Sequence, residues 1–197
     1  MKPWLAEFRR SLLAVAALAV ILCGLYPGVV WTLAYGLFPS RADGSLVVRG
    51  GEIRGSSLIA QGFTGPGYFH PRPSAAGTGW DAALSGGSNL GPLSKRLHAT
   101  VDRRAADYRA ENDLPSGALV PVDAVTASAS GLDPHITLKN AFLQARRVAK
   151  ARGLAETAVR KLIEERAEGR SMGVLGEPRV NVLELNLALD GGLDGGR

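Results

Sequence analysis

One stretch of the chain combines small hydroxyl residues with a nearby acid and base, the residue types of an acyl-transfer site. Residues 126–131 read TASASG, and Asp133 and His135 come shortly afterwards. A nucleophilic serine needs a base held by an orienting acid, and these two residues could supply that pair. Nothing resembling G-x-S-x-G accompanies them, and the chain has only three histidines. We therefore expect the small residues to allow close backbone packing rather than to form a serine hydrolase site.

A second stretch of small polar residues could cradle an anion with its backbone amides. Its members are Ser85, Gly86, Gly87, Ser88 and Asn89. Preceded by Leu84, the stretch resembles the LSGGQ signature of ABC-transporter nucleotide domains, with Ser88 in place of the signature's Gln. The chain has no G-x-x-x-x-G-K-[ST] sequence, which excludes an autonomous P-loop nucleotide site. As structure, the stretch is expected to be a tight turn that leads towards the next helix.

Residues 56–73 form a third candidate, a Gly- and Pro-rich loop that carries aromatic and basic side chains. Tyr68, Phe69, His70 and Arg72 could form a recognition surface, or they could fasten the loop to the core, which we favour. If the loop docks on a partner, then Tyr68, Phe69 and Arg72 are the residues expected to pack against it. His70 alone does not indicate a metal site, because no second ligand stands at helical or alternate-residue spacing.

The elements that must position these residues come after a long apolar segment, residues 11–38, which contains no charged residue. As a helix it would extend ~42 Å and could cross a bilayer. Before it stand three basic residues, Lys2, Arg9 and Arg10, and one acidic residue, Glu7. This excess of positive charge predicts a cytoplasmic N-terminus at 1–10, a membrane helix at 11–38 and an exported domain at 39–197. A cleaved signal peptide is the alternative, but the apolar run is about twice as long as a signal sequence needs.

Small residues recur every four positions inside this segment, at Gly24, Gly28, Thr32 and Gly36. This spacing lines them along one face and predicts close packing against a partner helix, with a kink at Pro27. The alternative is that glycine and proline are simply commoner in membrane helices.

The composition limits what the exported part can be. The net charge is +5, with basic and acidic residues interspersed, so the chain lacks the charged patch of a nucleic-acid-binding protein. The single cysteine, Cys23, lies in the apolar segment, so no disulfide holds the exported part. With 25 glycines and 11 prolines, a single loop-rich domain of mixed α+β class is expected.

The expected elements of that domain are few. Two short strands, 45–48 and 52–54, flank Gly50 and Gly51, and a possible third covers 122–125. An amphipathic helix is expected from residue 92 to about 110, with Leu93, Leu97, Val101 and Tyr108 inward and Arg103 and Arg104 in solvent.

Three further elements complete the expected domain. A helix capped by Thr137 should run to Arg152, and a second should cover 156–168. The basic residues near the first helix's C-terminus, Arg146, Arg147, Lys150 and Arg152, are explained by its dipole. Residues 181–190 are ambiguous between strand and helix, and we favour a helix within the core.

Taken together, these segments resemble the KdpC family, the small accessory subunit of the bacterial Kdp potassium-transporting P-type ATPase. The resemblance covers nearly the whole chain. It rests on the N-terminal span and on GSSLIAQGFTGPGYFHPRPSA (55–75), SGGSNLGP (85–92), VTASASGLDP (125–134), RRVAKARGL (146–154) and GEPRVNVLELNLALD (176–190). Two local departures concern helix starts: residues 135–138 lack an expected proline, and Ala155 replaces a capping residue.

The resemblance implies a single-pass protein of the bacterial inner membrane with a periplasmic C-terminal domain. Its implied partners are a potassium-translocating subunit, a P-type ATPase subunit and a very small helical subunit. The chain would catalyse nothing alone, and ATP and potassium would act on the whole complex.

The family is described as a catalytic chaperone that raises the ATP affinity of the ATPase subunit, with residues 85–89 likened to an ABC signature. Because ATP is cytoplasmic and these residues are expected outside, we expect indirect coupling, with direct contact as the alternative. A membrane-anchored hydrolase and a scaffold module are the alternative functions.

Overall fold

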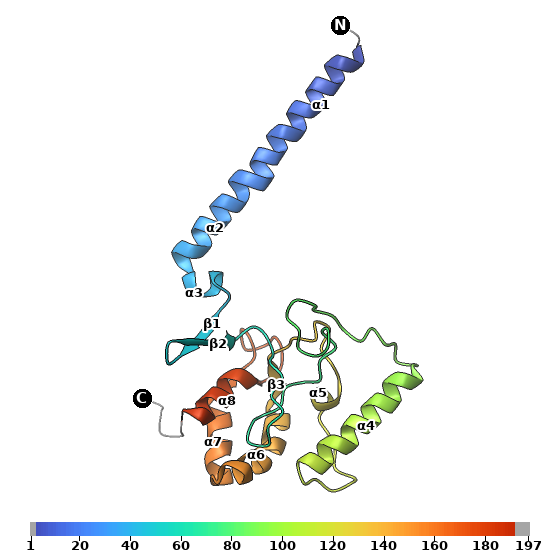
Figure 1. Ribbon diagram of the computed structural model, residues 1–197, viewed down its shortest axis with the longest axis vertical. Helices are drawn as coiled ribbons and strands as arrows, with labels where there is room; N and C mark the ends of the chain where they lie inside the picture. Colours follow the sequence, from blue (N-terminus) through green and yellow to red (C-terminus); the bar gives the residue numbers. More distant parts are fainter. Residues whose placement is uncertain (1–2, 192–197) are drawn as a thin grey trace. The chain divides into compact units, whose positions relative to one another are not determined.

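The computed structural model describes residues 3–191, and the chain divides into two compact units between Leu46 and Val47. The first unit is helical, and the second mixes helices with two small sheets (Figure 1). The expected fold class, one apolar N-terminal helix followed by an α+β region, is confirmed.

One continuous helix, Pro3–Leu37, makes up most of the first unit and is long and apolar enough to cross a membrane. It consists of α1 (Pro3–Ala19), the π-helical segment η1 (Val20–Leu25) and α2 (Tyr26–Leu37). The Tyr26 N–H donates to the Ile21 carbonyl, five residues back. The irregularity expected at Pro27 is therefore a wider π turn just before the proline. A short helix, α3 (Pro39–Ala42), comes next.

The expected hairpin comes next, made by β1 (Leu46–Arg49), which begins at the last residue of the first unit, and β2 (Glu52–Ser56). Gly50 and Gly51 have φ angles of 61° and 81°, as a tight turn with two left-handed residues requires. From Ser57 to Ser94 the chain then forms neither helix nor strand, which confirms the expected loop-rich region.

A second, antiparallel sheet lies inside the domain and was not expected from the sequence. Its strands are β3 (His135–Thr137), β5 (Arg179–Asn181) and β4 (Ala167–Glu168), with β5 in the centre. Val180 is paired with Ile136 on one side and Ala167 on the other. The predicted strand at 122–125 is wrong, because these residues form the short helix α5 (Val122–Val125).

Three helices enclose the core beside this sheet: α6 (Leu138–Arg152), α7 (Glu156–Glu165) and α8 (Val182–Asp190). Thr137 caps α6 by accepting from the Asn140 N–H, and Gly153 ends it with a φ angle of 67°. The fully buried side chains of the core include Phe69, Ile136, Val148, Val159, Ile163, Val180 and Leu185.

The structure decides two helix boundaries that the sequence left open or misplaced. Of residues 181–190, Asn181 ends strand β5 and the rest form helix α8 (Val182–Asp190), because Asn181 accepts the Glu184 N–H as an N-cap. The helix predicted over 156–168 ends at Glu165, because Ala167 and Glu168 pair with β5.

The helix predicted from residue 92 is α4 (Lys95–Glu111), capped by Ser94. Leu93 therefore precedes the helix and is exposed rather than in the core, whereas Tyr108 is buried as expected. The prediction that Arg104 points into solvent is also wrong. Arg104 is half-buried, and its guanidinium donates to the Val125 carbonyl.

Candidate functional site

The Gly- and Pro-rich loop is fastened to the core by polar side chains of two helices. Asn186 of α8 accepts the Phe69 N–H at 2.8 Å and donates to the Phe69 carbonyl at 2.9 Å. Gln144 of α6 does the same for His70, at 2.7 and 3.2 Å. The two side-chain amides thus provide hydrogen-bond partners for the N–H and C=O groups of Phe69 and His70, much as a neighbouring strand would.

Arg147 of α6 completes this fastening. Its guanidinium donates to the carbonyls of Pro66 and Tyr68 at 2.7 and 3.0 Å, to the Gln144 amide oxygen and to the Asn112 side chain. Burial lowers the pKa of the Arg147 guanidinium, but four acceptors stabilise its charge. The explanation of Arg147 by the helix dipole is therefore incomplete, and the same holds for Arg152, which donates to the Gly67 carbonyl and to Asp190.

The loop residues that were predicted to contact a partner lie in different environments in the structure. Phe69 is fully buried in the core, so its side chain offers no surface to a partner, and the fastening role that we favoured is confirmed for it. Arg72 pairs with Asp133 at 2.8 Å, and its Nε atom is buried with no hydrogen-bond partner among the described residues. Tyr68 lies under the Arg152 guanidinium, 4.7 Å from the ring centroid. The docking role of Tyr68 and Arg72 stays a prediction.

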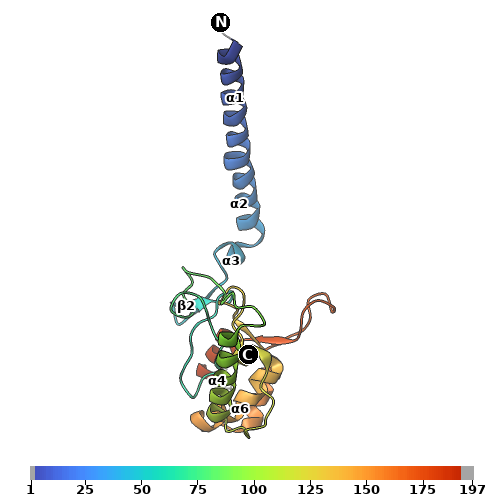
Figure 2. The same cartoon turned by 90° about the vertical axis from the view of Figure 1, so that its right-hand side faces the viewer.

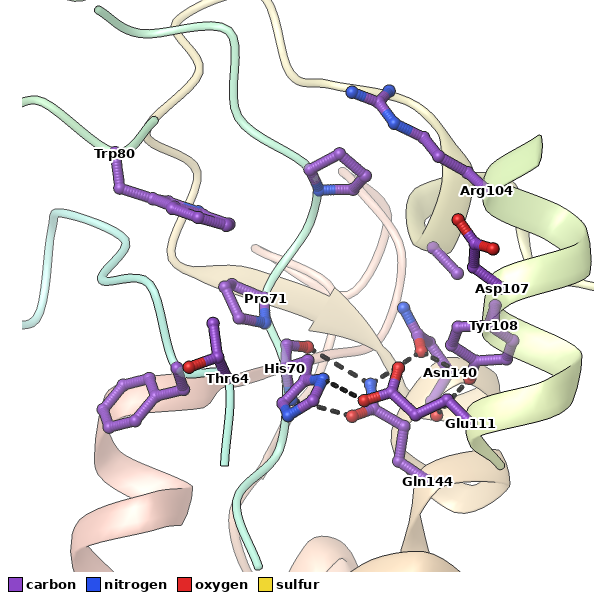
Figure 3. Close-up of a pocket in the computed structure, with 13 residues that line it drawn as sticks. Thr64, His70, Pro71, Trp80, Arg104, Asp107, Tyr108, Glu111, Asn140 and Gln144 are labelled. Carbon is purple, nitrogen blue, oxygen red and sulfur yellow. Dashed lines mark hydrogen bonds and ion pairs between the residues drawn. The ribbon is translucent and has the colours of Figure 1, made fainter. Parts of the chain in front are cut away.

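Beside the fastened loop lies an open cleft of about 340 Å³. Figure 3 shows Trp80 and Pro71 on one side and three residues of α4, Arg104, Asp107 and Glu111, on the other. Tyr108, Asn140 and Gln144 lie towards its base. The cleft therefore joins an aromatic and prolyl wall to a charged wall, and its lining residues include no nucleophile paired with a base.

His70 bridges the two walls of the cleft. Its Nδ1 atom lies 2.8 Å from a Glu111 carboxylate oxygen, and its Nε2 atom lies 3.0 Å from the Gly65 carbonyl oxygen (Figure 3 shows the first contact). Both ring nitrogens thus lie within hydrogen-bonding distance of an oxygen acceptor. The hydrogen bond from His70 lowers the pKa of Glu111, and burial only partly opposes it.

A buried polar chain under the cleft links α4, α5 and α6. Tyr108 donates to the Asn140 side-chain oxygen at 2.8 Å, and Asn140 donates to Asp123 at 3.1 Å. Asp123 also accepts the Thr137 N–H at 2.7 Å. Burial raises the pKa of Tyr108, so its hydroxyl remains a donor at neutral pH. The network fixes the start of α6 against α4 and α5.

The two runs of small polar residues pack against each other. Ser85 donates its hydroxyl, and Gly86 its N–H, to the Ser130 carbonyl at 3.0 and 2.9 Å. A Cβ atom on Gly87 would lie 2.9 Å from the Ala129 carbonyl oxygen, and Gly131 is similarly confined by Gly86 and Ala76. The expectation of close backbone packing is confirmed, and the tight turn expected at 85–89 is wrong, because residues 85–90 run without a turn.

The same geometry separates the residues of the possible triad. The ring nitrogens of His135 lie 3.5 Å from Asp133 and 3.6 Å from Glu168, so both face carboxylates rather than a serine hydroxyl. Ser128 instead accepts the Asp133 N–H and lies 3.4 Å from the Ser130 hydroxyl. Within residues 3–191, no group of three metal-ligating side chains is present.

In the anchor unit, the small-residue face is open. Gly24, Gly28 and Thr32 line a shallow groove together with Leu25, Val29 and Leu33. A Cβ atom on Gly24, Gly28 or Gly36 would meet nothing within 4 Å. Thr32 donates its hydroxyl to the Gly28 carbonyl, so this polar group is satisfied within the helix. Partner packing on this face stays a prediction.

These features define a class of protein: within residues 3–191, the chain has one helix fit to cross a membrane and a small α+β unit in which the buried side chains of Gln144, Arg147 and Asn186 hold one of its own loops. The family model described as "KdpC: K+-transporting ATPase, c chain" matches residues 8–191, and the chain belongs to this family.

Proteins named potassium-transporting ATPase KdpC subunit are similar over nearly their whole length. The one from Nitratidesulfovibrio vulgaris is 54% identical, over 96% of this chain and 95% of its own length. That of Koribacter versatilis is 50% identical over 92% of both chains, and that of Cereibacter sphaeroides 51% identical over 94% and 97%.

The sequence missed the residues that hold the site together. Gln144, Arg147 and Asn186 lie on the inward faces of helices, where a polar residue is unusual. On α6, Asn140, Gln144 and Arg147 are spaced as one helical stripe, and that spacing is the signal that could have revealed a polar contact with the loop.

Proposed function

We propose that this chain is a non-catalytic accessory subunit of an ATP-driven potassium uptake complex. The observation that carries the proposal is the family match over residues 8–191. The partners would be a potassium-translocating subunit, a P-type ATPase subunit and a small helical subunit. Ser85 and Gly86 both donate to the Ser130 carbonyl, which supports a packing role for these residues rather than a catalytic one.

The chain would be held in the bacterial inner membrane by the helix Pro3–Leu37, with its N-terminus in the cytoplasm and the α+β unit in the periplasm. The basic residues Arg9 and Arg10 before an uncharged run support this orientation. The tether would keep the α+β unit at a high effective concentration beside its partner, so a weak contact would suffice to hold it.

In this arrangement the α+β unit covers the outer face of the potassium-translocating subunit through its loops 55–92. Leu58 and Leu84 within these loops, and Leu93 directly after them, are exposed apolar side chains suited to such a contact. Phe69 is not a suitable probe, because truncating a fully buried side chain would disturb the core.

The surface is tested with Leu84→Ser combined with Leu93→Ser, against the control Leu119→Ser on an exposed loop outside this region. The double variant should reduce copurification with the partner chains or potassium-stimulated ATPase activity, and the control should change neither. A double variant that assembles and transports potassium like the parent chain would remove the capping role of these loops.

The ATP affinity of the ATPase subunit would be raised indirectly, through the packing of the complex. Direct contact between residues 85–89 and ATP is the alternative. ATP titration of the purified full-length chain in detergent separates the two: indirect coupling predicts no micromolar binding. Micromolar binding that Ser85→Ala with Ser88→Ala abolishes would favour direct contact.

A further inference from the structure

The hairpin that joins β4 to β5 carries exposed apolar side chains at its end. Met172, Val174 and Leu175, the tip residues, have exposed fractions of 92, 71 and 61%. In Figure 2 this arm, drawn in orange-red, extends away from the helices of its own unit. The tip residues therefore contribute almost nothing to the core of the domain.

The arm is built to hold this tip in one shape. Ser171 and Leu175 exchange two backbone hydrogen bonds, at 2.8 and 2.9 Å. Below them, Arg170 contacts both carboxylate oxygens of Glu177 at 2.9 Å. Met172 has a φ angle of 54°, a conformation that side chains other than Asn, Asp and Gly rarely adopt. The turn thus accepts backbone strain at a residue whose side chain points into solvent.

The charges beside the tip are paired within the arm. Arg170 pairs with Glu177, and Arg179 pairs with Glu168 at 3.1 Å. Across the described residues 168–179, the arm presents no unpaired basic group of the kind that binds anionic lipid headgroups. An apolar tip above neutral ion pairs instead fits an apolar pocket of a protein.

The small size of the tip limits the kind of protein chain that it can bind. Three side chains form a patch far smaller than the interface of a stable complex between freely diffusing chains, so the tip alone could not hold together two copies of this chain that nothing else joins. It could hold a partner that a membrane anchor already keeps beside it.

We infer that the tip residues 172–175 insert into an apolar pocket on another chain of the same membrane complex. The inference rests on the proposed function and deepens it, because it names a contact outside the loops 55–92.

Photocrosslinking in intact membranes tests the contact. A benzophenone amino acid replaces Val174 in the full-length chain, coexpressed with the other transporter chains, and the same probe at Leu119 is the control. We expect a crosslink from position 174 to a transporter chain. Crosslinks only to lipid, only to a second copy, or to nothing would each overturn the inference.

A substitution pair measures the contribution of the tip. Met172→Asn suits the left-handed backbone, and Val174→Thr keeps the side-chain shape, so the arm should retain its fold. We expect retention of this chain on tagged transporter to weaken about 10-fold or more, because two apolar groups leave the interface, while Leu119→Asn should change nothing. Unchanged retention would overturn the inference.

The two proposals fail differently. If the parent chain copurifies with the transporter but position 174 finds no protein partner, then only the inference on the arm fails. If the parent chain does not copurify at all, then the proposed function fails.

Discussion

Arg146 and Arg147 are neighbours near the C-terminus of α6, yet they have opposite environments. Arg146 is exposed, whereas Arg147 is buried and donates to two loop carbonyls. A helix dipole acts on both in a similar way, so it cannot account for the difference. The fastening of the loop makes Arg147 a structural residue of the candidate site.

Replacing Arg147 tests this view. Arg147→Met keeps much of the side-chain stem but leaves the Pro66 and Tyr68 carbonyls without their donor, and it should lower the free energy of unfolding by about 3 kcal/mol or more. Arg146→Met should change it by less than about 0.5 kcal/mol.

Urea unfolding of the full-length chain in detergent can measure both variants. Trp80 lies in the α+β unit, so its fluorescence reports on that unit once Trp4→Phe and Trp31→Phe have removed the anchor signals. Equal effects of Arg146→Met and Arg147→Met would contradict the fastening role.

Asp133 is a second residue whose surroundings set its chemistry. Burial alone would raise the pKa of Asp133, but hydrogen bonds from His135 and Arg72 outweigh burial and lower it to about 2. A carboxylate with a depressed pKa stabilises the fold above its ordinary pKa of ~4. This stabilisation is lost as the pH falls from about 4 towards 2.

Asp133→Asn should therefore be destabilising at pH 7, on the order of 1–2 kcal/mol after allowance for partial exposure. The difference from the parent chain should shrink as the pH falls from about 4 towards 2, because the Asp133 carboxyl of the parent chain is then progressively protonated. Asp102→Asn, at an exposed position of α4, is the control. The same urea unfolding experiment applies, and a difference that does not vary with pH would contradict the assignment.

At the scale of elements, α6 and the anchor helix use their faces differently. One stripe of α6, Ala141, Ala145 and Val148, packs in the core, and another, Asn140, Gln144 and Arg147, is polar and buried. The anchor helix, over its described residues 3–37, has no buried residue of its own. Its groove along Gly24, Gly28 and Thr32 is lined by small side chains, which would let another helix approach closely.

Gly28→Leu tests that face. A Cβ atom at Gly28 meets nothing within 4 Å, so the isolated chain should insert into the membrane normally. A partner helix that approaches closely would be pushed away, and the yield of intact complex should fall severalfold. Val30→Leu, outside the groove, is the control. An undiminished yield of complex with Gly28→Leu would count against packing on this face.

At the scale of the whole molecule, the two units are joined at one point in the chain, between Leu46 and Val47. The α+β unit has its own core, made by α6, α7, α8 and the β3–β5–β4 sheet. That the first unit anchors the chain in a membrane and that residues 39–197 are exported stay predictions.

The orientation is a prediction at this scale. A reporter that is active only in the periplasm, fused after Asp190, should be active, because the basic residues before the span keep the N-terminus inside. The same reporter placed before the span should be silent. Activity from a cytoplasm-active reporter after Asp190 would contradict this orientation. A mature N-terminus at Asp43, after the small residues Ser40 and Ala42 at the spacing of a signal-peptide cleavage site, would contradict an uncleaved anchor.

The sequence by itself determined the features that depend on neighbours along the chain. The apolar span, the turn at Gly50 and Gly51, and the caps Thr137 and Asn181 result from local composition and local hydrogen bonds. Long motifs in a constant order also pointed to the family.

Only the tertiary structure decided what links distant parts of the chain. Asn186 and Phe69 are 117 positions apart, and no periodicity along the sequence pairs a helix amide with a loop backbone. The strands β3, β4 and β5 have two or three residues each, too few for an alternating pattern to show. Buried polar groups must find partners wherever the fold supplies them. Three-dimensional packing therefore placed Phe69 in the core and brought the Arg147 guanidinium to the carbonyl of the neighbouring Tyr68, to which it donates.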